Sequence, residues 1–285
     1  MGYRGAGGPP PPRKGNFGGR PKPLHYFSEK VKGKSGPEAK ILRPFKIFAG
    51  KQDIPIVALD HGSDPYSCYI HAFALKGSLD NMVVCPSPGE DDPPCPVCIA
   101  LNKRAFWNGV LSIIDRSKWS PTEGKNAGKV YTDTRKLALI GSKSGPSYEE
   151  LGRKVKSWHG YCFDVSRPEP AVGEDGKKDW TGSPKIGLWF PVRTMSREEL
   201  KTEFEKAAVG YGMPVEEFIE PANYDLIFKP KSLDQLKAIA KDIAADLSAV
   251  KAAQAAQDRD GDGGGDDGDG VGAAAGDDDS SAISY

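Results

Sequence analysis

Between Ala39 and Val192, the apolar residues fall into short β-rich runs that are broken by Gly, Asn, Asp and Pro clusters. The runs cover residues 40–48, 53–60, 67–75, 110–116, 129–134, 136–140, 160–165 and 185–192. Strands this short favour a small antiparallel barrel over alternating strands and helices. The pattern therefore predicts a mainly β domain, with an ordered region that starts near Leu24.

Helical signals are few inside this region and stronger after it. A helix is expected over residues 98–107, and Ser147 with Glu150 forms a capping box that predicts a short helix through Lys154. Two further boxes follow, Ser196 with Glu199 and Ser232 with Gln235. The second opens an Ala-rich helix over about 233–257, whose apolar stripe packs on the domain or on a partner. The stripe consists of Leu233, Leu236, Ile239, Ala240, Ile243 and Leu247.

Composition changes sharply at the two ends of the chain. Gly and Pro supply about a fifth of the residues, and residues 1–23 combine them with five basic residues and no acid. Residues 258–285 hold nine Asp against one Arg, so this segment carries −8 and the rest of the chain +8. Both ends are expected to be disordered. A basic body with an acidic tail is typical of proteins that bind a polyanion and regulate that binding.

The chain contains no apolar run near the roughly 20 residues of a membrane span, and its first residues do not resemble a secretory signal. We therefore expect a cytoplasmic protein with no membrane partner. The five cysteines argue for metal rather than disulfides, because three of them lie within fourteen residues.

Cys95 and Cys98 have the two-residue gap that lets two thiolates bind one ion, and Cys85 adds a third sulfur. The fourth ligand is either His71 or Cys68. These two are an odd number of residues apart, so on a strand they face opposite sides and only one of them can bind. The set predicts one closed, structural Zn²⁺ site, whereas Cys162 is expected in the core.

The stretch from Ile41 to about Val192 resembles the T-even phage helix-destabilising single-stranded DNA-binding protein family. The resemblance depends on ILRPF at 41–45, a strand ending in His71, then Cys85, an acidic loop, CPVC at 95–98, KRAFWNGVLSIID at 103–115 and EGKNAGKVY at 123–131. It implies an OB-fold barrel with an inserted zinc-binding subdomain, and the zinc ligands His71, Cys85, Cys95 and Cys98. It also implies binding of single-stranded DNA in replication, recombination and repair. The Gly/Pro-rich residues 1–23 differ from the basic, structured N-terminal module of the family.

The expected organisation has four parts. A disordered basic arm covers residues 1–23. The OB-fold DNA-binding core covers 24–195, with the zinc lobe at about 71–98. A helical segment covers 196–257, and the disordered acidic tail covers 258–285. The tail is expected to compete for the DNA groove and to recruit replication and recombination proteins, and the arm is a candidate for contacts between neighbouring molecules on one strand.

Binding of single strands needs basic groups for phosphates and aromatic faces for bases, and the sequence interleaves the two. We expect these groups to line a cleft between the zinc lobe and the barrel. Trp119 and Tyr131 are the first candidates for stacking, because their surroundings are polar; apolar neighbours favour the core for Trp107 and Trp189. The candidate DNA contacts are Lys103, Arg104, Trp107, Arg116, Lys118, Trp119, Lys129, Tyr131, Arg135, Lys136, Lys156 and Trp158.

Two other classes of protein have requirements that the sequence does not meet. A zinc-ribbon transcription regulator or double-stranded DNA-binding protein would need a base-reading helix, and none is evident. A nuclease or primase would need clustered carboxylates for magnesium. The body has no compact acidic cluster, no phosphate-binding loop and only scattered histidines (His25, His61 and His159), so an enzyme is not expected.

Overall fold

The computed structural model describes residues 24–33, 36–76, 78–87, 89, 91–120, 127–173, 176–179, 183–184 and 186–260. The expected arm, and the tail after residue 260, lie outside these residues. The strands are β1 (Ser28–Gly33), β2 (Gly36–Ile41), β3 (Arg43–Pro44), β4 (Ile54–Ala58), β5 (Tyr66–Leu75), β6 (Ser78–Val84), β7 (Phe106–Asp115), β8 (Thr134–Gly141), β9 (Tyr161–Ser166), β10 (Ala171–Val172), β11 (Lys178–Asp179) and β12 (Leu188–Thr194). The helices are α1 (Pro96–Leu101), α2 (Gly145–Val155), α3 (Arg197–Tyr211), α4 (Val215–Phe218), α5 (Tyr224–Ile227) and α6 (Leu233–Asp260).

The largest sheet is organised around β7. Its pairing order is β12-β9-β4-β7-β5-β6, and β8 also pairs with β7. Residues 106–110 of β7 pair with β5 and residues 113–115 pair with β4, while β8 covers residues 108–115. The run Val110–Asp115 is buried throughout, as a central strand covered on both faces should be.

The sheet is mixed, because the short β3 pairs with β8 in parallel whereas the other pairs are antiparallel. The hairpins β1–β2 and β10–β11 form separate small sheets. The predicted mainly β class is confirmed, and the closed barrel of an OB fold stays a prediction.

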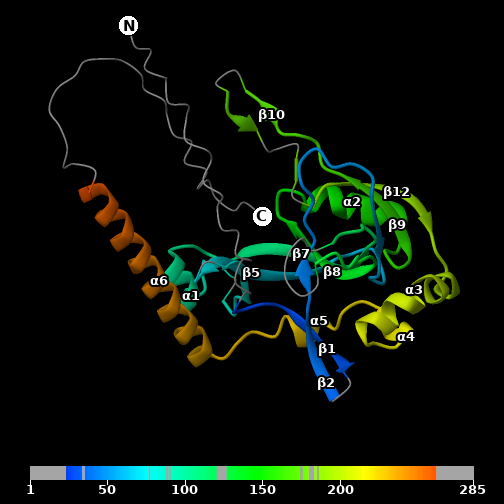
Figure 1. Ribbon diagram of the computed structural model, residues 1–285, viewed down its shortest axis with the longest axis horizontal. Coiled ribbons are helices and arrows are strands. Elements are labelled where there is room, and N and C mark those ends of the chain that lie inside the picture. Colours follow the sequence, from blue (N-terminus) through cyan, green and yellow to red (C-terminus); the bar gives the residue numbers. More distant parts are fainter. Residues whose placement is uncertain are drawn as a thin grey trace, which may run out of the picture.

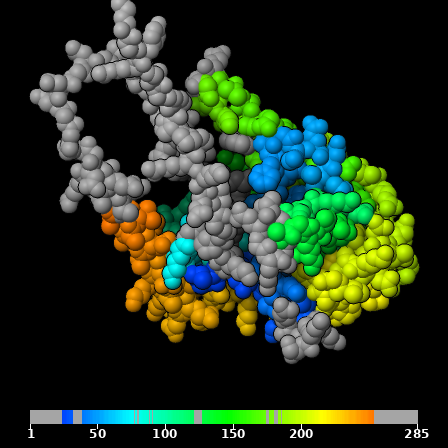
Figure 2. All heavy atoms as spheres, in the orientation of Figure 1, coloured from blue at the N-terminus to red at the C-terminus, as the bar shows by residue number. Residues whose placement is uncertain are grey.

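Helices cover different parts of the sheet (Figure 1). Tyr148 of α2 packs in one buried core cluster with Trp158, Phe163 and Trp189. A second core joins Phe204 of α3 to the sheet, and the half-buried Cys162 packs against it. Figure 2 shows α6 and the α3–α4 segment on opposite flanks of the molecule. None of the helices in the described ranges combines the length and apolar character needed to cross a bilayer.

Two of the predicted capping boxes are confirmed. The Ser196 N–H donates to Glu199 Oε2 (2.6 Å) and the Glu199 N–H donates to Ser196 Oγ (3.3 Å). In the same way, the Ser232 N–H donates to Gln235 Oε1 (3.0 Å) and the Gln235 N–H donates to Ser232 Oγ (3.3 Å). The box at Ser147 is wrong: α2 begins at Gly145 after Ser144, whose side chain makes no capping bond. Pro146, with its fixed φ, starts the helix earlier.

The helix predicted over residues 98–107 is also corrected. The observed helix α1 begins at Pro96 and ends at Leu101, and the C-cap residue Asn102 adopts a left-handed conformation with φ of 49°. Phe106 and Trp107 instead begin β7. The run at 129–134 does not form the expected extended strand; an isolated bridge pairs Tyr131 with Trp119.

Candidate metal centre and nucleic-acid surface

The alternation of side chains along β5 shows which of His71 and Cys68 lies beside the other three cysteines. Because alternate residues face opposite sides, Cys68 packs in the core with Phe27 and Leu42, whereas His71 faces Cys85, Cys95 and Cys98. His71 is therefore the residue that the structure brings to the three cysteines. Cys85 follows the paired strand β6, and its N–H donates to Tyr69 O at 2.9 Å.

The other two cysteines lie at the start of α1. Cys95 is the N-cap residue, and its sulfur accepts a hydrogen bond from the Cys98 N–H at 3.4 Å. Pro96 occupies the first turn, where its missing N–H costs nothing. The same short turn therefore caps the helix and presents two sulfurs to one point.

The four ligand atoms have the spacing of a tetrahedral site. The three sulfur–sulfur distances are 3.6, 3.8 and 3.9 Å, and His71 Nε2 lies 3.3 Å from Cys95 Sγ and 3.6 Å from Cys98 Sγ. Metal–sulfur bonds of about 2.3 Å and metal–nitrogen bonds of about 2.0 Å imply tetrahedral edges of about 3.8 and 3.5 Å. The buried cluster could hold one metal ion.

Burial sets the protonation of this cluster. Removal from water raises the pKa of the Cys85 thiol to about 12 and raises that of Cys95, and it lowers the pKa of His71 to about 4. Without a cation, the thiols of Cys85 and Cys95 therefore stay protonated and the imidazole of His71 stays neutral. A bound metal ion would displace the thiol protons.

Helix α6 completes the lobe around the cluster. Leu236, Ile239 and Ile243 pack with Phe73 and Val97 in one buried group that includes the three cysteines. The Lys76 N–H also donates to Asp246 Oδ2 at 3.2 Å. Of the two interpretations of the apolar stripe, packing on the domain is correct, although Leu233 and Leu247 at its ends are exposed.

The expected nucleic-acid contacts differ widely in exposure. Lys103, Arg104, Lys118, Trp119, Lys129 and Lys156 are exposed, and Trp107, Arg116, Tyr131 and Lys136 are half-buried. Arg116 pairs with Asp133 and Glu203, and Lys136 Nζ lies 2.5 Å from Asp115 Oδ2. The charges of Arg116 and Lys136 are therefore already compensated within the protein.

Two expected contacts, Trp158 and Arg135, are corrected. Trp158 is fully buried, and its indole N–H donates to Ser63 O at 2.7 Å. Arg135 is 5% exposed and binds both carboxylate oxygens of Glu29, at 2.9 and 3.0 Å. Neither side chain lies on the surface that a DNA strand would meet. Their neighbours in sequence are basic or polar. The sequence around them therefore predicted exposed side chains, although both side chains are buried.

The remaining candidates do not gather in one cleft. Lys103 and Arg104 precede the first residue of β7, whereas Lys118 and Trp119 follow its last. A ten-residue strand is about 30 Å long. Lys103 and Arg104 therefore lie beyond one end of β7, and Lys118 and Trp119 lie beyond the other.

Two aromatic rings stand out beyond the end of β7. Trp119 and Tyr131 exchange backbone hydrogen bonds of 3.0 and 2.8 Å, and their rings stack at 4.9 Å. Trp119 is 44% exposed, and Lys129 Nζ lies 5.2 Å from the Tyr131 ring centre. The arrangement places an aromatic face and a cationic group on the two bridged segments 118–119 and 129–131 (the Trp119 hairpin).

Sequence reasoning missed Phe48, whose side chain is 81% exposed. The residue lies between Lys46 and Lys51, and this alternation of basic and aromatic residues is the signal that could have identified it. An exposed aromatic ring beside lysines is the same combination that the Trp119 hairpin presents.

Comparisons with protein-family models, with curated proteins and with solved structures found no match to this chain. The family resemblance therefore stays a prediction.

Proposed function

We propose that this protein binds single-stranded DNA without strong sequence preference, and protects and organises it during phage DNA replication, recombination and repair in the host cytoplasm. The proposal includes an OB-type core and a binding role rather than an enzymatic one. The observation that carries it is the stack of the exposed Trp119 on the half-buried Tyr131, with Lys129 Nζ 5.2 Å from the Tyr131 ring centre and Lys118 next to Trp119 in the chain.

The chemistry of this hairpin matches what a single strand offers. Unpaired bases expose flat faces that stack on aromatic rings, and each stack contributes about 1–3 kcal/mol. Ammonium groups nearby bind the phosphates that link those bases. A duplex buries its base faces, so a stacking surface of this kind favours single strands.

We further propose that the ion in the Cys85–Cys95–Cys98–His71 cluster is Zn²⁺ with a structural role. Three thiolates and one imidazole are a common structural zinc set, and four protein ligands leave no position for a reacting water. The burial of all four side chains supports a closed site.

The proposal is tested by the fluorescence anisotropy of a labelled oligo-dT and of a labelled duplex, each titrated with the protein at low and high salt. We expect binding to oligo-dT that weakens with salt, and weak binding to duplex. Trp119→Ala should reduce the affinity for oligo-dT by about fivefold or more, because it removes one stacking surface.

Phe190→Ala is the matched control, since Phe190 is another exposed aromatic residue, at 52% exposure, on the sheet-edge strand β12. This variant should bind as the wild type does. Tighter binding to duplex than to oligo-dT would instead favour the zinc-ribbon regulator or double-stranded DNA-binding protein. An unchanged affinity of the Trp119→Ala variant would remove this hairpin from the proposed DNA surface.

A further inference from the structure

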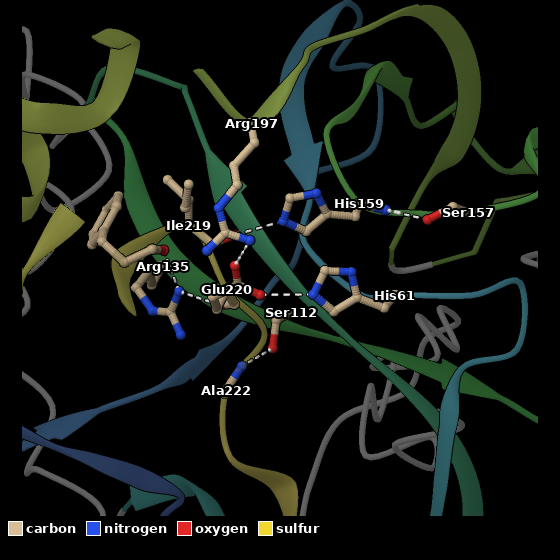
Figure 3. Close-up of polar contacts among 10 residues, drawn as sticks. His61, Ser112, Arg135, Ser157, His159, Arg197, Ile219, Glu220 and Ala222 are labelled. Carbon is tan, nitrogen blue, oxygen red and sulfur yellow. Dashed lines mark hydrogen bonds and ion pairs between the residues drawn. The ribbon is translucent and has the colours of Figure 1, made fainter. Parts of the chain in front are cut away.

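A second group of metal-ligating side chains lies far from the cysteines in sequence and comes from three separate elements (Figure 3). His61 follows β4, His159 precedes β9 and Glu220 follows α4. The chain scatters these residues over 160 positions, and the fold gathers one potential ligand atom from each within 4.8 Å of the others.

The two imidazoles are aligned. Their rings stack with centroids 4.4 Å apart and planes 14° apart. His61 Nε2 lies 2.7 Å from Glu220 Oε2, and His159 Nε2 lies 3.2 Å from Ile219 O. Figure 3 shows that both rings present a nitrogen toward the side where Glu220 and Arg197 lie. An ion pair with Glu220 needs only one histidine, whereas here a second imidazole brings another nitrogen donor within 4.8 Å of the same carboxylate.

The carboxylate is held in place from its other side. Arg197 Nη1 lies 2.6 Å from Glu220 Oε1, which leaves Oε2 directed at His61. Such an outer partner orients a ligating carboxylate and keeps it ionised. Because the His61 side chain is 59% exposed and the Glu220 side chain is 27% exposed, an ion can enter from solvent without unfolding the protein.

We infer that His61, His159 and Glu220 form a second metal site, for a divalent ion of the zinc type. Two imidazole nitrogens and one carboxylate oxygen are a ligand set that Zn²⁺ accepts, and three protein ligands leave a coordination position open to water. The ion replaces the His61–Glu220 and His159–Ile219 hydrogen bonds, and the two rings tilt so that their in-plane lone pairs converge on it. This site is therefore exchangeable, unlike the buried cysteine cluster.

A bound ion would join three parts of the fold. His61 and His159 belong to connections of the large sheet, and Glu220 belongs to the helical segment that follows it. Zinc would therefore link the α3–α4 segment to the sheet, and its binding would stabilise the folded state.

The test uses the full chain already loaded at its cysteine cluster, dialysed against micromolar Zn²⁺ and then analysed for zinc per chain. The wild type should hold about one more equivalent than His61→Gln and His159→Gln. Glutamine at 61 retains a hydrogen-bond donor for Glu220 and removes the ligand. The wild type should also gain about 2–5 °C in thermal midpoint with added zinc, and the two variants should not.

His25→Gln is the matched control, because it removes a histidine that belongs to neither metal-ligating group of the described residues. It should behave as the wild type does. The acidic residues 258–285 are present in every variant, so weak binding there cancels in the comparison. Equal zinc content and equal thermal shifts in the wild type and His61→Gln would overturn the inference, and the three residues would then form an ion-pair group only.

Discussion

At the scale of single residues, Arg135 shows how a basic side chain can stabilise the fold from a buried position instead of adding to the charged surface. Its guanidinium binds Glu29 through two nitrogens and also donates to the carbonyls of Phe218 and Glu220. Tyr211 donates to the same Glu29 at 2.8 Å. One arginine on β8 thus connects β1, α3 and the residues around the end of α4.

Arg135→Met should therefore lower the free energy of unfolding by about 3–5 kcal/mol, because it leaves the buried Glu29 carboxylate without its partner. Urea unfolding, followed by far-UV circular dichroism, measures the change. The exposed Lys129→Met should shift stability by well under 1 kcal/mol.

The same two variants separate structure from binding. The folded fraction of Arg135→Met should bind oligo-dT as the wild type does, whereas Lys129→Met should bind it more weakly. A wild-type stability for Arg135→Met would show that the Glu29 pair contributes nothing net to the fold.

At the scale of elements, local patterns predicted much of the fold and of the metal centre. Strand alternation limited the fourth ligand to one of His71 and Cys68, and reciprocal capping predicted the starts of α3 and α6. The patterns failed where a proline competed with another signal, as Pro146 did with the Ser147 box.

Contacts between distant residues could not be predicted from the sequence. The carboxylate of Asp60 accepts hydrogen bonds from the Ser112 N–H and the Tyr224 hydroxyl, each at 2.6 Å. Nothing near Asp60 in the chain indicates these partners. The same holds for His61 and His159, which are scattered in sequence and stacked in the fold.

Helix α6 and the cysteine cluster should lose their order together. Cys98→Ser removes one ligand, so we expect loss of the metal ion and a fall of about 10 °C or more in the thermal midpoint. Because Leu236, Ile239 and Ile243 pack against this lobe, amide hydrogen exchange across residues 236–243 should accelerate.

Cys68→Ser is the matched control, three residues from His71 but on the other face of β5. It should retain the full zinc content, measured by elemental analysis, and slow exchange in α6. Retention of zinc by Cys98→Ser, or its loss in Cys68→Ser, would contradict the assignment of the ligands.

At the scale of the whole molecule, the zero net charge hides an uneven distribution. Residues 261–285 contain seven Asp and no basic residue, so the rest of the chain carries +7. In the described part, several lysines along the β7 region are exposed while Arg116, Arg135 and Lys136 are paired. The positive surface available to a polyanion is therefore smaller than the sequence suggests. Under the proposed function, competition from the acidic segment would then have a larger effect.

Deletion of residues 261–285 should raise the affinity for oligo-dT severalfold at about 50 mM salt, because it removes seven negative charges that compete with phosphates for the same lysines. The gain should shrink as salt increases, since screening weakens both interactions. Anisotropy titrations of the full chain and of the shortened chain at several salt concentrations measure this gain.

A control variant in which Asn replaces the seven Asp keeps the length of the segment. This variant should reproduce the gain in affinity, which would assign the effect to charge. If the deletion raises affinity and the Asn variant does not, the segment acts by occupying space. Equal affinities for all three proteins at low salt would mean that the acidic residues do not compete with DNA and have another role, such as the recruitment of partners.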